Sequence, residues 1–248
     1  ALSRPTRLVV CAHASNICPA TLPLAAIGRL CHARGALFAV DAAQSAGVLD
    51  INMEEMQIDA LAVPGHKGLY GPMGVGMLLL GKEIRPDTLL EGGNGLDSLS
   101  GGMGDDLPER YEPGPLPLPA IAGLRAGIEF VRRVTPEAIR EKETALGVFL
   151  RDALTELPGV HVAVPHLAGG TVLFRADGVS SEDIAARLDA AGSGICVRPG
   201  FHCAALAHRT LGTPEGGAVR ASFGWFNTRR DAEQLIQSLR GGLPGRNG

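Results

Sequence analysis

Residues 59–68, DALAVPGHKG, lead a short apolar run into Lys67, a lysine in a glycine-flanked turn. An earlier apolar run at residues 36–40 ends in the same way at Asp41, with Gln44 three residues further on. Both runs have the length and composition of buried strands. In open α/β sheets, ligands bind beyond the carboxyl ends of the strands, so Asp41 and Lys67 are expected at one edge of a parallel sheet.

An acid and a lysine at neighbouring strand ends indicate a site for pyridoxal 5'-phosphate (PLP). PLP needs a primary amine to hold its aldehyde as a Schiff base and a carboxylate against its pyridine nitrogen to keep the ring protonated. Lys67 and Asp41 supply these two groups, and Gln44 is placed to reach the phenolic oxygen of the ring. The alternative is that Asp41 caps a helix and Lys67 is a solvated loop residue, which is the usual role of either residue alone.

Several ordered motifs resemble the class V aminotransferase family, which has PLP fold type I, and within it the cysteine desulfurases and selenocysteine lyases. The similarity lies in residues 13–16 (HASN), 40–47 (VDAAQSAG), 64–72 (PGHKGLYGP), 197–204 (VRPGFHCA) and 219–222 (VRAS). The resemblance covers most of the chain and implies a PLP-dependent enzyme.

The resemblance also implies roles for single residues. Asn16 would face the cofactor and the substrate carboxylate, and His66 would lie near the cofactor phosphate. Arg220 would grip the substrate carboxylate, with Arg198 as a second candidate. A guanidinium suits that task because it binds a carboxylate by two parallel hydrogen bonds. Arg220 lies in an apolar strand pattern, where a buried structural ion pair is the alternative explanation.

Cys203 corresponds to the sulfur-accepting cysteine of the desulfurases. Its thiolate would attack the sulfur of the substrate, which requires an exposed cysteine that can lose its proton. A lone cysteine is more often a small buried residue, and this is what we expect of Cys11, Cys31 and Cys196. A zinc site made of Cys196, Cys203 and the two nearby histidines is disfavoured, because their spacing contains no C-x-x-C pair.

Composition indicates a globular chain able to bury a sizeable core. It has 248 residues, of which 45% are hydrophobic, and a formal net charge of -3. No basic bias points to nucleic acid, and no apolar run is long enough to span a bilayer. Five cysteines at uneven spacing suggest reduced thiols rather than a disulfide framework, and the sequence starts with no signal peptide pattern. We therefore expect a cytoplasmic protein.

Hydrophobic periodicity predicts the elements around the site. Residues 8–13 and 60–63 read as further buried strands, residues 24–34 as a helix closed by Gly35, and residues 75–80 as another strand.

The second half of the chain begins with a long segment at 91–119 that is rich in Gly and Pro, and such loops are usually functional or mobile. Helices are predicted at 120–134 and 136–157, the second with Thr135 as its cap and Pro136 in its first turn.

The predicted fold is α/β. Residues 1–134 are expected to form a partial PLP-binding large domain of fold type I with a mixed, mainly parallel sheet, and residues 135–248 a linking helix and a small C-terminal α+β domain. By the resemblance, the N-terminal part of the family fold is absent, including a phosphate-holding turn and a ring-stacking histidine. Pro115 stands where relatives tend to have a threonine that reaches the partner subunit's phosphate.

The predicted function is removal of sulfur or selenium from cysteine or selenocysteine, giving alanine and a persulfide on Cys203. The resemblance implies a homodimer that passes sulfur to an acceptor protein. Cysteine spacing, charge and hydropathy predict that no metal, nucleic acid or membrane is involved. Two alternatives stay open at this point. One is an inactive remnant acting as a scaffold or dimer partner, and the other is another class V enzyme, such as an aminotransferase or epimerase, in which Cys203 is dispensable.

Overall fold

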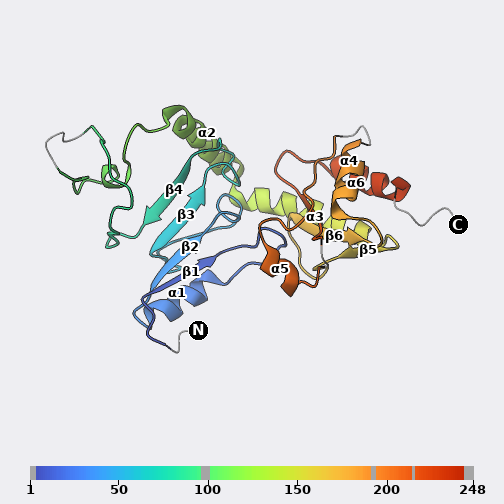
Figure 1. Ribbon diagram of the computed structural model, residues 1–248, viewed down its shortest axis with the longest axis horizontal. Helices are drawn as coiled ribbons and strands as arrows, with labels where there is room; N and C mark the ends of the chain where they lie inside the picture. Colours follow the sequence, from blue (N-terminus) through green and yellow to red (C-terminus); the bar gives the residue numbers. More distant parts are fainter. Residues whose placement is uncertain (1–3, 96–100, 191–193, 214–215, 243–248) are drawn as a thin grey trace. The chain divides into compact units, whose positions relative to one another are not determined.

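A computed structural model describes residues 4–95, 101–190, 194–213 and 216–242 (Figure 1). The chain divides into two compact units. The sheet unit consists of Ala1–Ala12, Pro23–Gly47 and Ile51–Arg133. The C-terminal unit consists of His13–Leu22, Val48–Asp50 and Val134–Gly248.

The sheet unit is built on four strands in the order β1-β2-β3-β4. They are β1 (Leu8–Ala12), β2 (Leu37–Asp41), β3 (Ala60–Pro64) and β4 (Gly76–Leu80). β1, β2 and β3 are parallel and β4 runs antiparallel to β3, which gives the mixed, mainly parallel sheet that was predicted. Residues 65–75, which link β3 to β4, contain none of the helix that a parallel crossover usually carries, and this suits an antiparallel return.

One face of this sheet is covered by helices α1 (Leu24–His32) and α2 (Leu118–Val134). Leu24 and Cys31 of α1 and Leu124 of α2 belong to one buried cluster with Phe38, Val40, Leu61 and Val63 of the sheet. These strand residues alternate with exposed ones, as side chains on a strand must. The helix bounds differ from those predicted by about two residues at one end of each helix, which is the usual uncertainty at frayed helix ends.

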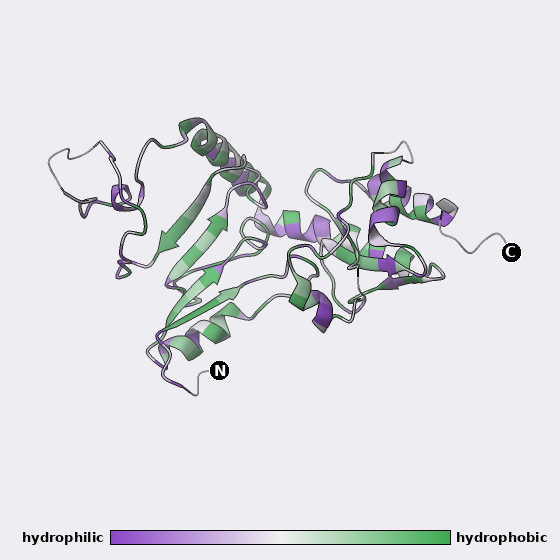
Figure 2. Ribbon diagram, viewed as in Figure 1, coloured by the Kyte–Doolittle hydropathy of each residue, from purple (hydrophilic) through white to green (hydrophobic). Residues whose placement is uncertain are grey.

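The opposite face of the sheet is apolar and exposed. Leu8 and Val10 of β1, Leu37 of β2 and Leu78 of β4 are between 44% and 66% exposed. The strands are coloured hydrophobic in Figure 2. Parallel sheets are normally covered on both faces, so this surface is unusual for a parallel arrangement.

The C-terminal unit contains an antiparallel sheet in the order β5-β6-β7. Its strands are β5 (Val160–Val162), β6 (Thr171–Ala176) and β7 (Val219–Ser222). Its helices are α3 (Pro136–Thr155), α4 (Ser181–Ala190), α5 (Ala205–Thr210) and α6 (Arg229–Gly242). Helices α3, α4 and α6 share one buried core with strands β6 and β7. Its members include Leu150, Phe174, Leu188, Val219 and Leu235. This mixture of strands and helices is the α+β arrangement that was predicted.

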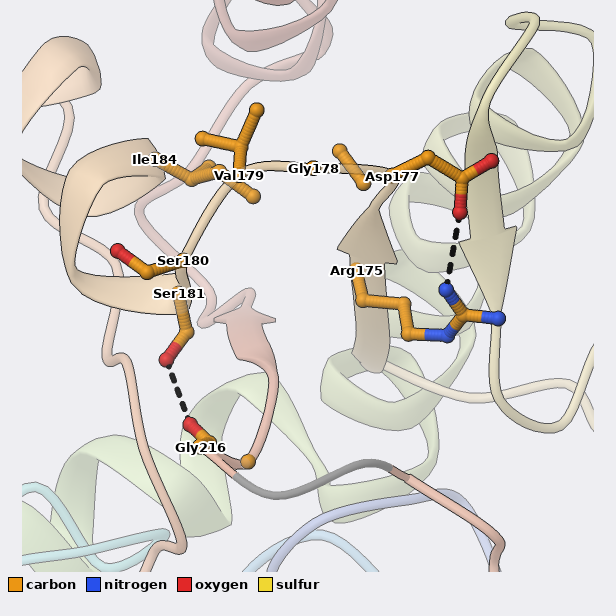
Figure 3. A pocket seen from close by; sticks show the side chains of 10 residues that line it. Arg175, Asp177, Gly178, Val179, Ser180, Ser181, Ile184 and Gly216 are labelled. Carbon is orange, nitrogen blue, oxygen red and sulfur yellow. Dashed lines mark hydrogen bonds and ion pairs between the residues drawn. The ribbon is translucent and has the colours of Figure 1, made fainter.

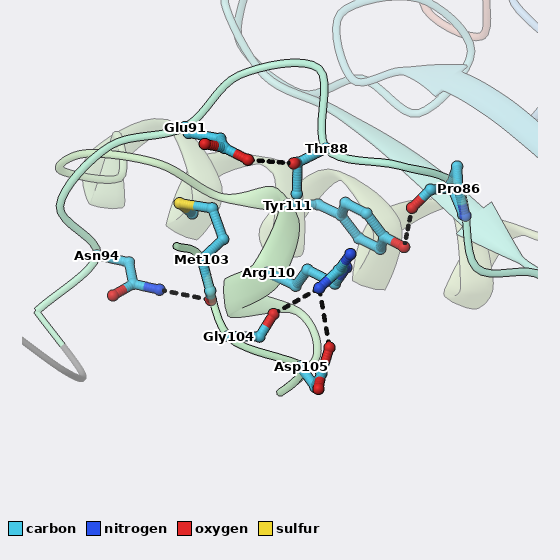
Figure 4. Close-up of polar contacts among 9 residues, drawn as sticks. All are labelled: Pro86, Thr88, Glu91, Asn94, Met103, Gly104, Asp105, Arg110 and Tyr111. Atoms are coloured by element: carbon cyan, nitrogen blue, oxygen red, sulfur yellow. Dashed lines mark hydrogen bonds and ion pairs between the residues drawn. The ribbon is translucent and has the colours of Figure 1, made fainter. Parts of the chain in front are cut away.

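The long segment after β4 is held together by polar contacts (Figure 4). Tyr111, in the short 3-10 helix Glu109–Tyr111, donates its hydroxyl to the Pro86 carbonyl at 2.9 Å. Arg110 donates to the Gly104 carbonyl at 2.7 Å and to the Asp105 carboxylate at 2.9 Å. In the described parts of this segment, these side-chain contacts supplement backbone hydrogen bonds such as that from the Gly114 N–H to the Gly93 carbonyl at 2.9 Å.

In the part of the chain that the structure describes, no helix has both the length and the apolar character that a bilayer crossing requires.

Thr135 caps α3 as predicted, but its backbone is strained. Its hydroxyl accepts the N–H of Ala138 at 3.2 Å, while its φ of 78° lies where a β-branched residue is an outlier. Thr135→Ala loses a cap worth about 1 kcal/mol, whereas replacing a cap residue by glycine costs only a few tenths of that. Glycine alone relieves the positive φ, so Thr135→Gly should be more stable than Thr135→Ala by about 1 kcal/mol or more in chemical unfolding. Equal stabilities would show that the backbone here is unstrained.

Candidate active site

Asp41 is the last residue of β2, and its exposed carboxylate lies at the carboxyl end of the parallel strands. Its Oδ1 accepts the N–H of Ala43 at 2.8 Å, an arrangement that fixes the carboxylate against its own turn. The side chain of Gln44 is exposed on the same loop. The alternative role of Asp41 as a helix cap does not apply, because a turn rather than a helix follows it.

Lys67 lies in the turn after β3, the neighbour of β2 in the sheet. The Lys67 carbonyl accepts the N–H of Tyr70 at 2.9 Å, and the Gly65 carbonyl accepts the N–H of Gly71 at 2.8 Å. These bonds close a tight loop in which the side chains of His66 and Lys67 are exposed. Among the described residues, no hydrogen bond or ion pair engages the Lys67 amine.

Gly47 joins the two loops. Its φ is 84°, and a Cβ at this position would come within 2.2 Å of the Gly68 carbonyl oxygen and 2.6 Å of its carbon. Only glycine permits both the left-handed backbone and this close approach. The Asp41 loop and the Lys67 loop are therefore in direct backbone contact at the carboxyl edge of the sheet.

A test of this contact is the pair Gly47→Ala and Gly74→Ala. Gly74 has the same φ of 84° but nothing within 4 Å of an added Cβ, so it serves as the matched control. Alanine at position 74 should cost only about 1–2 kcal/mol for its left-handed backbone. Alanine at position 47 should cost at least about twice as much and shift the amide resonances of Lys67 and Gly68, because the loops must separate. Equal losses of stability in chemical unfolding would refute the close approach.

The described residues of this edge fit the reactive ring of PLP. Lys67 offers an amine without a competing partner, and the free carboxylate oxygen of Asp41 is available to a protonated pyridine nitrogen. Ser45 adds a buried hydroxyl that has no partner in the described part of the chain. His66 is exposed beside Lys67 and is free to meet an anion.

The C-terminal unit holds the other predicted site residues. The backbones of Arg198 and Arg220 form an antiparallel bridge, with N–H to carbonyl distances of 3.0 and 2.8 Å. Nη1 of Arg220 donates to the Asn16 carbonyl at 2.7 Å, and Nδ2 of Asn16 donates to the His202 carbonyl at 2.6 Å. Asn16 thus connects the strand that carries Arg220 to the loop that carries Cys203.

Arg220 retains unused hydrogen-bonding capacity. Its Nε is buried and has no partner among the described residues, none of which places a carboxylate within ion-pair distance. Burial lowers the pKa of the guanidinium, and the nearby charge of Arg198 adds to this, with Cys203 acting in the opposite direction. The described part of the chain therefore shows no structural ion pair at Arg220, and a bound carboxylate would satisfy Nε.

Cys203 is exposed at the tip of a strained turn. His202 and Cys203 have φ values of 55° and 60°, two consecutive left-handed residues that are not glycine. Nη2 of Arg198 lies 3.8 Å from the Cys203 sulfur, within hydrogen-bonding range for sulfur. The turn therefore presents a thiol to solvent beside a guanidinium.

Cys196 is exposed, so the prediction that it is buried was wrong, whereas Cys31 is buried as predicted and Cys11 is half-buried. Residues 195–198 alternate, with Ile195 and Val197 packed against the core, which turns Cys196 to the same side as Arg198. The five cysteines are all free, and no cluster of three metal-ligating side chains occurs among the described residues.

Glu143 on α3 is a titratable group that the sequence did not single out. Burial raises the pKa of its carboxyl to about 7. Its side chain lies against the backbone of Gly170, where an added Cβ would meet the Glu143 Cβ at 2.8 Å. The folded chain therefore binds a proton at pH 5–7 that the unfolded chain releases, so this group stabilises the fold at low pH and the effect is lost as pH rises towards 7.

Glu143→Gln should remove this pH dependence. We expect no change in unfolding free energy near pH 4.5 and a gain of about 1–2 kcal/mol at pH 8, reduced from the full burial cost because water still reaches part of the side chain. Glu141→Gln, at an exposed position of the same helix, is the matched control for the loss of a carboxylate. Chemical unfolding at the two pH values measures the effect, and a gain at pH 4.5 would contradict it.

A pocket of about 330 Å³ lies at the start of α4 (Figure 3). Ser181 donates its hydroxyl to the Gly216 carbonyl at 2.9 Å and accepts the N–H of Gly200 at 3.2 Å. Arg175 and Asp177 form an ion pair at 3.1 Å on the other side of the pocket. Ser181 thus anchors the beginning of the segment that leads to Cys203.

Comparison with known families places these motifs in context. The class-V aminotransferase family matches residues 1–235. This chain belongs to that family. Its fold is accordingly that of the PLP-dependent enzymes of the family, as the sequence predicted.

Curated relatives of this class V chain carry the name probable cysteine desulfurase. The protein from Methanothermobacter thermautotrophicus is 34% identical over 96% of this chain and 61% of its own length. The protein from Halalkalibacterium halodurans is 33% identical over 96% of this chain and 58% of its own length. The chain therefore spans about 60% of the length of these relatives.

Solved structures agree with this assignment. The apo cysteine desulfurase from Thermococcus onnurineus NA1 matches with a TM-score of 0.85 and 33% identity, over 95% of this chain and 59% of that chain. The cysteine desulfurase CsdA from Escherichia coli, in an S-sulfonic acid form, matches with a TM-score of 0.87 and 28% identity, over 97% of this chain and 60% of that chain.

Proposed function

We propose that this chain carries the PLP-binding and sulfur-accepting residues of a cysteine desulfurase. The observation that carries the proposal is Cys203, an exposed thiol on a strained turn beside Arg198, in a class V chain whose relatives bear that name. A structural cysteine would be expected in the core instead.

In the proposed reaction, Lys67 holds the cofactor through its amine and then takes the α-proton of the substrate. Bound PLP supplies an electron sink for the electrons released at the substrate carbons. Asp41 keeps the pyridine nitrogen protonated, and Gln44 and His66 contact the phenolic oxygen and the phosphate. Each of these roles uses a group that is exposed or unpartnered in the sheet unit.

The residues of the C-terminal unit bind the amino acid and receive its sulfur. Arg220 binds the substrate carboxylate through its free Nε, with Asn16 and Arg198 beside it. The Cys203 thiolate attacks the substrate sulfur, forming an S–S bond as the Cβ–S bond breaks, and the electron pair of that bond passes to the substrate carbon. A proton then completes alanine, and the persulfide on Cys203 passes its outer sulfur to an acceptor protein.

The substrate is an amino acid with a β-thiol or β-selenol, cysteine or selenocysteine. We place the enzyme in the cytoplasm as a homodimer, and the free cysteines suit such a reducing compartment.

An experiment on the cofactor site is a PLP titration followed by borohydride reduction and peptide mapping. The label should appear on Lys67, saturate with PLP, and disappear in Lys67→Ala but not in the loop control Lys82→Ala. Equal labelling of Lys82 or Lys142, the other two lysines of the chain, would sink the proposed cofactor site.

A separate experiment tests sulfur transfer. Incubation with cysteine and PLP should add one sulfur atom to the peptide that contains Cys203, and turnover to alanine should fall by roughly 100-fold or more in Cys203→Ser. Cys196→Ser, an exposed cysteine of the same unit, is the matched control and should keep its activity. Unchanged turnover in Cys203→Ser would favour another class V reaction, detected as keto acid rather than sulfide.

A non-catalytic scaffold is a second candidate, and the exposed apolar face of the sheet unit favours it. In that case the chain binds a partner through this face, and no saturable label appears on Lys67.

A further inference from the structure

Two histidines lie buried behind the Cys203 turn. His202 is 3% exposed and His208 is 1% exposed. Their rings are nearly parallel, with centroids 5.2 Å apart, and Nδ1 of His202 lies 3.1 Å from Nε2 of His208. The role proposed for Cys203 leaves both side chains unexplained.

Their hydrogen-bond partners fix where the protons are. Nε2 of His202 lies 2.8 Å from the Arg198 carbonyl, which can only accept, so Nε2 carries a hydrogen. A neutral imidazole has one N–H, and Nδ1 of His202 must therefore accept from Nε2 of His208. Nδ1 of His208 is then an acceptor too, and the Thr213 hydroxyl at 2.7 Å is its donor.

The four groups form one chain with a single direction, from Thr213 through His208 and His202 to the Arg198 carbonyl. Both rings are neutral in this order. Burial lowers the pKa of both histidines, and the charges of Arg220 and Arg198 lower that of His202 further. The neutral order is therefore the one expected at pH 7–8.

This series of four hydrogen-bonded groups can accept one extra proton without losing a hydrogen bond. The Thr213 hydroxyl also lies 2.9 Å from the His208 carbonyl, so it can turn to that oxygen when Nδ1 of His208 becomes protonated and donates to it. A second proton would place an N–H on His202 against the N–H of His208 at 3.1 Å. The single extra proton is shared across the contact between Nδ1 of His202 and Nε2 of His208, and the charges of Arg220 and Arg198 near His202 favour placing the positive charge on His208.

The series of hydrogen bonds ends at the Arg198 carbonyl, on the backbone that presents the reactive groups. His202 binds the Arg198 carbonyl with its ring and accepts Asn16 with its own carbonyl. Cys203 follows directly in the left-handed conformation, where each non-glycine residue costs about 1–2 kcal/mol. A turn under such strain persists only where its surroundings determine it.

We propose that His202 and His208 are positioning residues, ordered by Thr213, that hold the Cys203 turn and the adjoining Arg198 in place for sulfur transfer. This inference rests on the proposed role of Cys203 as sulfur acceptor. Neither ring touches the substrate, and both act through the backbone.

The first test reads the protons directly by long-range ¹H–¹⁵N NMR of the labelled chain. At pH 8 both rings should be in the Nε2–H form, and on acidification Nδ1 of His208 should protonate before His202 does. The exposed His166 provides the reference for an unconstrained ring. An Nδ1–H form of either ring at pH 8, or earlier titration of His202, overturns the proposal.

The second test uses His208→Leu, which removes the donor, and His208→Gln, whose amide N–H restores a donor to His202. His166→Leu is the matched control for loss of an imidazole. The readout is the rate of iodoacetamide labelling of Cys203 relative to the exposed Cys196 in the same molecule, mapped by mass spectrometry. We expect this ratio to fall about threefold or more in His208→Leu, because Arg198 is no longer held beside the sulfur, and to recover in His208→Gln.

A ratio that stays unchanged in His208→Leu, or that falls equally in His208→Gln, overturns the proposal. In assays with cysteine, His208→Leu should lower kcat with little change in KM or in PLP labelling of Lys67. Because the NMR and alkylation readouts need no turnover, they separate the two ideas: an intact histidine chain with no persulfide on Cys203 would refute the desulfurase function alone.

Discussion

The contact between Gly47 and the Gly68 carbonyl is the constraint on which the candidate cofactor site depends. Parallel strands bring their carboxyl ends to one edge, but this alone leaves the loops beyond them free to diverge. A glycine without a Cβ, held at a φ of 84°, lets the loop after β2 rest on the backbone of the loop after β3. The acid and the amine therefore reach one place through backbone packing, while one oxygen of Asp41 is held by its own turn and the Lys67 amine has no partner among the described residues.

In the C-terminal unit, polar side chains rather than a close backbone contact position the reactive groups. Its reactive groups sit on a turn with unfavourable backbone angles, between the Arg198 bridge to β7 and the start of α5. Polar side chains take over: Asn16 binds the His202 carbonyl, and the buried histidines bind the carbonyl of Arg198. A buried polar network of this kind stabilises the fold only when every donor meets an acceptor. Unpartnered capacity remains at Nε of Arg220, where an anion is expected to bind.

Much of the fold was predictable because it rests on local patterns. Short apolar runs marked β1, β2 and β3, and a threonine before a proline marked the start of α3. The sequence could not show that Cys196 faces outward or that Glu143 lies half-buried against Gly170. These features depend on tertiary packing between distant segments. His202 lies in the turn before α5 and His208 lies within α5, six residues later. This spacing matches no sequence motif that predicts a contact between the two rings.

The exposed face of the sheet unit has a consequence for Asp41. Alternation along β2 puts its carboxylate on the same side as Leu37, and the register sets it between Ala12 of β1 and Ala62 of β3. Any layer that settles on the apolar surface of this sheet must approach that carboxylate and strip water from it. Charges are more strongly felt where water is scarce. Covering the sheet would therefore do two things at once. It would bury the exposed leucines, and it would strengthen the attraction between the Asp41 carboxylate and any cation beside it.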